Sequence, residues 1–208
     1  MITVPRVERD DPDGRALAVD ILRAGGIVAL PTDTVYGIAV ALDTPGGIER
    51  LFRVKERPPE KGIALLLADA AQAWEIGVAN AAAQRLADAF WPGPLTLVLE
   101  RRPGVALPDA LTGGAETVGV RVPDHEAPRA LAASLGPLPT TSANLSGEPD
   151  ALEAAAVLAQ LGGRVDLILD GGRTRGAVAS TVVDCTKRPV AILREGALGE
   201  RRIRQALA

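Results

Sequence analysis

Lys55, Arg57 and Lys61 bring three cations into one short stretch of the chain. The sequence contains only three lysines, so the placement of two of them within seven residues is a local enrichment. Two consecutive prolines follow Arg57, and because proline ends a helix we expect a stiff turn here. Two ammonium groups and a guanidinium on one turn suit a polyphosphate, which arginine binds bidentately and lysine as a point charge. A solvated loop, in which the neighbouring glutamates neutralise these cations, is the alternative.

A second stretch, residues 140–147, carries four hydroxyls and one amide within seven residues and ends in glycine. We expect a loop that can surround a phosphate or a ribose with neutral hydrogen-bonding groups through Thr140, Ser142 and Asn144. The alternative, a cap for the helix expected from Leu152, is less attractive because that helix begins several residues later. A serine nucleophile is disfavoured, since no Gly-x-Ser-x-Gly turn exists and His125 is the only available base.

Residues 31–37, Pro-Thr-Asp-Thr-Val-Tyr-Gly, follow an apolar run that proline terminates. The two hydroxyls and the carboxylate of this segment could present several closely held polar groups to a small polar ligand. Threonine and aspartate are also common turn residues, so a plain capping turn is the simpler interpretation of this segment taken alone.

Two further arginines lie in or beside predicted strands. Alternation over residues 117–122 places Thr117, Gly119 and Arg121 on one face of a strand. An arginine on an otherwise apolar strand requires either a bound anion or a buried ion pair, and both remain open. Ser180 begins another expected strand and Arg194 ends the next; β-propensity explains the valines there but not Arg194.

The elements that must position these residues alternate between helix-like and strand-like segments. This alternation indicates a mixed α/β sheet in a single domain spanning residues 1–208, with the candidate residues where strands give way to loops, as in open α/β sheets. Residues 101–116 are expected to form a surface loop. We expect helices over residues 13–25, 47–54, 81–90, 126–135, 152–161 and 199–207, and strands over residues 27–30, 35–42, 63–67, 95–100, 117–122, 165–169, 181–184 and 190–193.

The composition excludes several classes of protein. The 208 residues carry a formal net charge of −3, which disfavours a surface that acts throughout as a nucleic-acid clamp but permits a local basic pocket. A single cysteine permits neither an internal disulfide nor a cysteine-based zinc cluster. Phosphate-binding and dinucleotide-binding glycine motifs are absent. No apolar run is long enough to span a membrane and no signal peptide is evident, so we expect a cytoplasmic protein.

Seven stretches, taken in order, resemble the YrdC-like family of L-threonylcarbamoyladenylate synthases. They run from residue 31 to residue 196, and it is the ordered set rather than any one of them that is specific. The resemblance implies a twisted, mixed open sheet flanked by helices around a large concave, positively lined cavity, and a length like that of the short bacterial form. The stretches are Pro-Thr-Asp-Thr-Val-Tyr-Gly (31–37), Lys-x-Arg-Pro (55–58), Phe-Trp-Pro-Gly-Pro-Leu-Thr-Leu-Val (90–98), Val-Gly-Val-Arg-Val-Pro (118–123), Ser-Ala-Asn-Leu-Ser-Gly (142–147), Ser-Thr-Val-Val-Asp (180–184) and Leu-Arg-Glu-Gly (193–196).

The resemblance also implies an activity. L-threonine, bicarbonate and ATP, the last with Mg²⁺, would give L-threonylcarbamoyladenylate and pyrophosphate. The product would supply downstream threonylcarbamoyl-transferase proteins that modify the adenosine beside the anticodon of certain tRNAs, and weak binding of tRNA or other RNA is compatible with this role. No metal-ligating residue of the protein is implied.

The family signature assigns roles to particular residues of this chain. Lys55 and Arg57 would be catalytic, and both would hold ATP. Glu56 stands where many relatives have glycine, which adds a carboxylate near the phosphates. The remaining ATP contacts would be Lys61, Thr117, Ser142, Asn144 and Arg194, and the L-threonine contacts would be Thr34, Arg121, Thr140 and Ser180.

Other interpretations use the same residues differently. A structured-RNA-binding module could use the same basic cavity, although the net charge and the scarcity of aromatic residues disfavour it. A carbamoyl-transfer domain of hydrogenase maturation would need cysteine-based zinc motifs that this chain lacks. His125 is expected at a helix start, and Cys185 is expected to be a small buried residue rather than a nucleophile.

Overall fold

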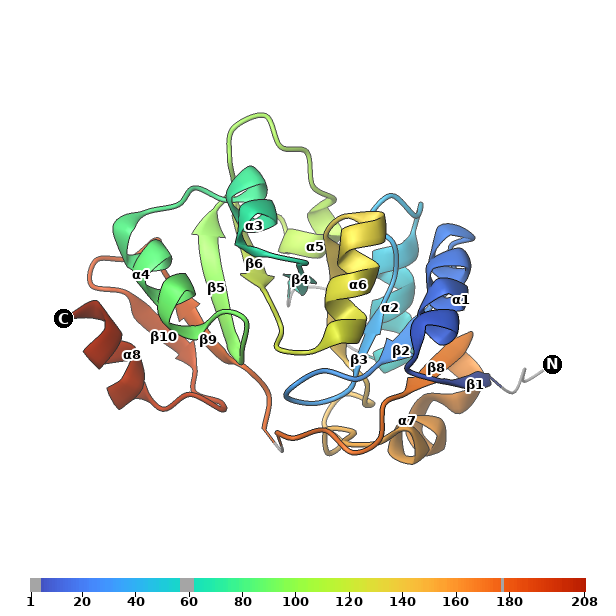
Figure 1. The fold of residues 1–208 in the computed structure, drawn as a ribbon. Coiled ribbons are helices and arrows are strands. Elements are labelled where there is room, and N and C mark those ends of the chain that lie inside the picture. Colours follow the sequence, from blue (N-terminus) through green and yellow to red (C-terminus); the bar gives the residue numbers. More distant parts are fainter. Residues whose placement is uncertain (1–4, 57–61, 177) are drawn as a thin grey trace.

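The computed structural model describes residues 5–56, 62–176 and 178–208, and within them the strands form one sheet (Figure 1). The strands are β1 (Arg6–Arg9), β2 (Val28–Leu30), β3 (Gly37–Ala39), β4 (Ala64–Leu66), β5 (Leu95–Glu100), β6 (Thr117–Arg121), β7 (Leu138–Ser142), β8 (Leu167–Asp170), β9 (Thr181–Asp184) and β10 (Ala191–Arg194). Their order across the sheet is β1-β8-β2-β3-β7-β4-β6-β5-β9-β10.

The sheet is mixed, as the alternating pattern predicted. Parallel pairing joins β8 to both β1 and β2, β4 to β6, and β5 to β9, while the other neighbours are antiparallel. Because the strand order departs from the chain order, distant segments become neighbours. Gly37 of β3 is paired with Ser142 of β7, which brings residues 31–37 beside residues 140–147.

Eight α-helices and one 3₁₀ turn, at Gly162–Arg164, accompany the strands in the described part of the chain. Side-chain caps explain several helix starts: Asp11 accepts from the backbone N–H of Gly14, and Asn80 from that of Ala83. The helices are α1 (Pro12–Arg23), α2 (Gly47–Lys55), α3 (Ala70–Ile76), α4 (Ala81–Phe90), α5 (Asp109–Thr112), α6 (Glu126–Leu135), α7 (Ala154–Leu161) and α8 (Glu200–Leu207).

The main core lies between the central strands and helices that follow one another along the sheet (Figure 1). Helix α3 packs on β6 and α4 on β5, whereas α6 packs on β4 and β7 and places Leu131 in a second, smaller core with Ala18 and Leu22 of α1. Leu97 and Leu99 of β5 and Val118 and Val120 of β6 belong to the main core and are almost fully buried. Since successive strand residues point to opposite faces, the intervening residues of β5 and β6 face the other side.

Most expected elements are present, and several coincide with the observed bounds, including Ala81–Phe90, Leu95–Glu100, Glu126–Leu135 and Thr181–Asp184. The sequence pattern gave no expectation for β1, which has one apolar residue among four, or for α3, which is only seven residues long. Residues 101–116 were expected to be a loop but include α5, whose Leu111 is 1% exposed and packs into the core.

Candidate active site

A cavity of about 460 Å³ opens on the face of β5 and β6 opposite their core residues Leu97, Leu99, Val118 and Val120. Its lining residues recur at every second position along β4, β5 and β6, which is the period of side chains on one face of a strand. The strand residues that line it are Gly37, Ala64, Leu66, Thr96, Val98, Thr117, Gly119, Arg121, Thr140, Thr141, Ser142, Val182, Leu193 and Arg194.

The expectation that the candidate residues gather where strands give way to loops holds for Arg121, Ser142 and Arg194, which end their strands, and it fails for Thr117 and Thr140. Thr117 begins β6 and Arg121 ends it, so the cavity extends along the whole strand rather than beyond its end. Thr140 and Ser142 were expected in a loop but belong to β7. The physical reason is that threonine is β-branched and fits a strand, so a run of hydroxyls does not by itself imply a loop.

Arg121 is the buried cation of the cavity, with 5% of its surface exposed. Its Nε donates to the carbonyl of Gly93 at 3.0 Å, Nη1 to Thr34 Oγ1 at 2.9 Å, and Nη2 to Asp33 Oδ1 at 2.5 Å. Burial lowers the pKa of Arg121, and the negative charge of Asp33 opposes that shift. The sequence left open whether Arg121 has a bound anion or an ion-pair partner. The structure shows the ion pair with Asp33, and Arg121 also lines the cavity.

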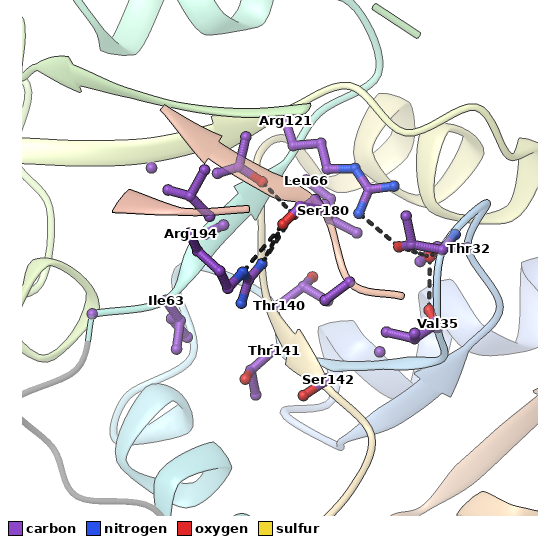
Figure 2. A pocket seen from close by; sticks show the side chains of 18 of the residues that line it. Thr32, Val35, Ile63, Leu66, Arg121, Thr140, Thr141, Ser142, Ser180 and Arg194 are labelled. Atoms are coloured by element: carbon purple, nitrogen blue, oxygen red, sulfur yellow. Dashed lines mark hydrogen bonds between the residues drawn. The ribbon is translucent and has the colours of Figure 1, made fainter. Parts of the chain in front are cut away.

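The segment that holds Asp33 and Thr34 is a hydrogen-bonded turn between β2 and β3. Thr32 Oγ1 donates to the carbonyl of Val35 at 2.7 Å and accepts from the N–H of Thr34 at 3.1 Å, and the two threonine hydroxyls lie 3.0 Å apart (Figure 2). The segment caps no helix, since β3 follows it, but its threonines do act as turn residues, and Thr32 and Thr34 line the cavity as well. These bonds hold the Thr34 hydroxyl against Arg121.

Tyr36 attaches this turn to the chain that follows β8. Its side chain is fully buried, its hydroxyl donates to the carbonyl of Gly172 at 2.8 Å, and it accepts from the N–H of Gly171 at 3.2 Å. A further backbone bond joins the N–H of Gly176 to the carbonyl of Asp33 at 3.1 Å. The turn is thus held on both sides by residues distant in sequence.

Ser180, Thr96 and Arg194 form a second polar group on the cavity wall. The hydroxyls of Ser180 and Thr96 lie 2.8 Å apart, and both residues are buried. Arg194 Nη2 donates to the carbonyl and the hydroxyl of Ser180 at 2.8 and 3.2 Å (Figure 2). Arg194 lines the cavity and is exposed, and partial desolvation of its guanidinium lowers its pKa.

Lys55 lies next to the cavity rather than on its lining, and it is 2% exposed. Its Nζ donates to the carbonyl oxygens of Ser142 and Asn144, both at 2.6 Å. The side-chain oxygens of the same two residues lie 3.2 and 2.9 Å from Nζ. Lys55 therefore stabilises the backbone and side chains of this segment, while Arg57 and Lys61, with their predicted contacts to ATP, lie outside the described residues.

The structure brings seven of the predicted site residues onto one cavity: Thr34, Thr117, Arg121, Thr140, Ser142, Ser180 and Arg194. Lys55 and Asn144 adjoin it through Ser142. Three polar lining residues, Thr96, Thr112 and Asp150, were not singled out. Thr96 falls within the stretch at 90–98 and could have been found by its alternation with the core leucines; Thr112 and Asp150 had no such signal.

His125 and Cys185 take the structural positions expected of them. His125 caps α6 by accepting at Nδ1 from the N–H of Ala127 at 3.2 Å. Cys185 is buried, and burial raises the pKa of its thiol to about 12.

Among residues 5–56, 62–176 and 178–208, no three side chains of His, Cys, Asp or Glu are grouped as a metal would require. None of the helices described is both long and apolar enough to cross a bilayer.

The family model Sua5/YciO/YrdC, described as telomere recombination, matches residues 20–196. The chain is 40% identical over 187 residues to the threonylcarbamoyl-AMP synthase of Pyrococcus abyssi, covering 88% of this chain and 54% of that protein. It is 38% identical over 190 residues to the threonylcarbamoyl-AMP synthase of Bacillus subtilis, covering 90% and 55%. The chain thus spans about half the length of these curated relatives.

Among solved structures, the crystal structure of P. abyssi Sua5 complexed with L-threonine superposes with a TM-score of 0.91 at 35% identity. The match covers 99% of this chain and 61% of that one. The predicted fold, a twisted open α/β sheet flanked by helices, is confirmed by this likeness and by the strand order.

Proposed function

Because the chain belongs to the Sua5/YciO/YrdC family, we propose that it forms L-threonylcarbamoyladenylate and pyrophosphate from L-threonine, bicarbonate and ATP. The observation that carries this proposal is Arg121, a buried guanidinium that lines the cavity among threonine and serine hydroxyls. The product would pass to threonylcarbamoyl-transferase proteins that modify tRNA. The curated relatives named threonylcarbamoyl-AMP synthase support the assignment over the part of their length that this chain matches.

L-threonine would bind beside Arg121. A guanidinium suits a carboxylate because it offers two parallel N–H donors, and Asp33 and Thr34 hold this one in place. The hydroxyls of Thr34, Thr140 and Ser180 would hydrogen-bond the other polar groups of the amino acid. A relative of known structure was crystallised with L-threonine, which supports an amino-acid substrate for this cavity.

ATP would occupy the side of the cavity formed by Thr117, Ser142 and Arg194, with Asn144 behind Ser142. Arg57 and Lys61 would contribute further cations. The contacts of Lys55 give it a positioning role in addition to charge neutralisation, because its ammonium group fixes the carbonyls of Ser142 and Asn144. In this scheme the Ser142–Asn144 segment presents its polar groups to the nucleotide from a rigid support.

The chemical steps need no protein nucleophile. The amine of threonine would combine with bicarbonate to form a carbamate and water. A carbamate oxygen would then attack the α-phosphorus of ATP in line, forming the new P–O bond as the bond to pyrophosphate breaks. The protein's contribution is to orient the two substrates and to neutralise the charge that develops on the leaving group, through Arg194, Lys55 and Arg57.

Mg²⁺ would enter with ATP as part of the substrate. The residues fit this arrangement, because the described lining contains one carboxylate, Asp150, among hydroxyl groups, and magnesium is commonly held by substrate phosphates with one or two carboxylates. The Mg²⁺ ion would neutralise part of the negative charge of the ATP phosphates.

The direct test is pyrophosphate release by the purified chain in the presence of ATP, Mg²⁺, L-threonine and bicarbonate. Release should require both threonine and bicarbonate, and Arg121→Ala should raise the KM for threonine more than that for ATP. Release that is indifferent to threonine and bicarbonate would refute the proposal. Tight binding of structured RNA without turnover would instead favour the binding-module interpretation.

A further inference from the structure

Gly119 is the middle residue of strand β6 and forms part of the cavity floor. Thr117 and Arg121 lie two residues away on either side of it, on the same face of the strand, and both also line the cavity. Two residues of strand span about 7 Å. Because Arg121 is proposed to hold L-threonine and Thr117 to hold ATP, Gly119 lies on the stretch of floor between the two substrate positions.

The neighbouring strands add little bulk beside Gly119. Val98 of β5 is its partner in the antiparallel register. On the other side lies Ala64 of β4, which the parallel register of β4 and β6 places next to it. Ala64 also lines the cavity and carries only a methyl group. The floor thus lacks a side chain at Gly119 and has a very small one beside it.

The packing of the protein does not require glycine at position 119. Its φ is outside the left-handed region, and a Cβ atom built there would come no closer than 3.7 Å to a described atom outside residues 118–120, which is ordinary van der Waals contact. Gly37, also on the lining, differs, because a Cβ there would lie 2.7 Å from Thr140 Cγ2. A glycine inside a strand weakens the strand and often marks a place where a ligand approaches the backbone closely.

We propose that Gly119 leaves room on the floor for the junction of the two substrates and so determines how closely they can approach. This inference rests on the proposed function, in which a carbamate oxygen attacks the α-phosphorus of ATP. The carbamate and the α-phosphate must then meet between the groups held at Arg121 and at Thr117. A side chain at position 119 would stand beneath that junction and hold the reacting atoms apart, and misplacement by about 1 Å can lower a rate about a hundredfold.

The test compares Gly119→Ala and Gly119→Val with the wild type in three measurements. The kcat for pyrophosphate release should fall about tenfold for alanine and about a hundredfold or more for valine. Calorimetric binding of L-threonine alone, and of ATP with Mg²⁺ alone, should stay within about threefold of the wild type, since neither end of the cavity is filled. The midpoint of urea denaturation should be unchanged or higher, because both residues restrict the unfolded chain more than glycine and valine favours a strand.

Ala191→Val is the matched control, because it enlarges a partly exposed residue of β10 that is not part of the described cavity lining. It should change neither pyrophosphate release nor the binding of either substrate. For Gly119→Val, an unchanged kcat, a lowered denaturation midpoint, or weakening of one substrate alone by as much as kcat falls would overturn the role of Gly119 and leave the proposed function standing. Absence of pyrophosphate release dependent on threonine and bicarbonate in the wild type would overturn the proposed function itself, and this inference with it.

Discussion

Asp33 Oδ1 accepts a hydrogen bond from Arg121 Nη2 at 2.5 Å, and this buried ion pair links the turn before β3 to the end of β6. The side chains are 9% and 6% exposed, so neither charge is well solvated. A charge buried in this way is tolerated because its partner is present, and removal of one partner leaves the other uncompensated.

Asp33→Asn should therefore lower the free energy of unfolding by about 3–5 kcal/mol, the range for breaking a buried pair from one side. Urea denaturation provides the measurement, and the affinity for L-threonine should fall as well because Arg121 loses its orientation. Asp43→Asn is the control, since Asp43 is exposed. If the two variants were equally stable, the pair would not contribute to the fold.

Substitution of Lys55 should affect both stability and activity. Its ammonium group donates to the carbonyls of Ser142 and Asn144 while almost fully buried, so Lys55→Met should cost at least about 3 kcal/mol, counting two charge-assisted hydrogen bonds at about 1.5 kcal/mol each. Chemical denaturation and pyrophosphate release are measured together. Lys187→Met, at an exposed lysine, is the control and should change neither quantity. Full stability of Lys55→Met with loss of activity would show that Lys55 serves ATP alone.

Thr96 should position Ser180 without itself touching the substrate. Thr96→Val removes the hydroxyl 2.8 Å from Ser180 Oγ, and we expect the KM for L-threonine to rise about three- to tenfold, as for loss of one neutral hydrogen bond, with little change in kcat. Thr96→Ser keeps the hydroxyl and should restore the wild-type KM. A large fall in kcat, or no rescue by serine, would contradict this role.

Tyr36 is the only tyrosine in the chain, so absorbance near 295 nm reports its ionisation alone. Burial, the largest cause, raises its pKa to about 12. The native protein should titrate near that value, and the urea-unfolded protein near the ordinary value of about 10. A native titration near 10 would mean that the hydroxyl is accessible to solvent.

The same shift predicts a loss of stability in alkali. Between pH ~10 and ~12 the unfolded chain has released the tyrosine proton while the folded chain retains it, so the free energy of unfolding should fall with rising pH by up to about 1.4 kcal/mol per unit. Below pH ~10 this contribution is fully present. Cys185, whose pKa is also raised, titrates in an overlapping range and is common to both proteins when wild type is compared with Tyr36→Phe. The difference between wild type and Tyr36→Phe in the slope of the free energy of unfolding against pH is therefore due to Tyr36.

The local spacing of apolar and polar residues was sufficient to predict many helices and strands and to identify the types of residue that form the site. Helices α4 and α6 follow from apolar spacing, and the alternation along β6 correctly placed Thr117, Gly119 and Arg121 on one face. Burial of an arginine on that face required a counter-ion, and the sequence already contained Asp33 within a turn rich in polar groups.

Tertiary structure alone decided how these residues combine. The pairing of β3 with β7 and of β4 with β6 depends on a strand order that departs from chain order, and local periodicity carries no information about which strands become neighbours. It therefore could not indicate that Asp33 pairs with Arg121, that Lys55 supports Ser142 and Asn144, or that Asp150 reaches the cavity. The sequence determined which groups are available for chemistry, and long-range packing determined which of them meet and which of them line the cavity.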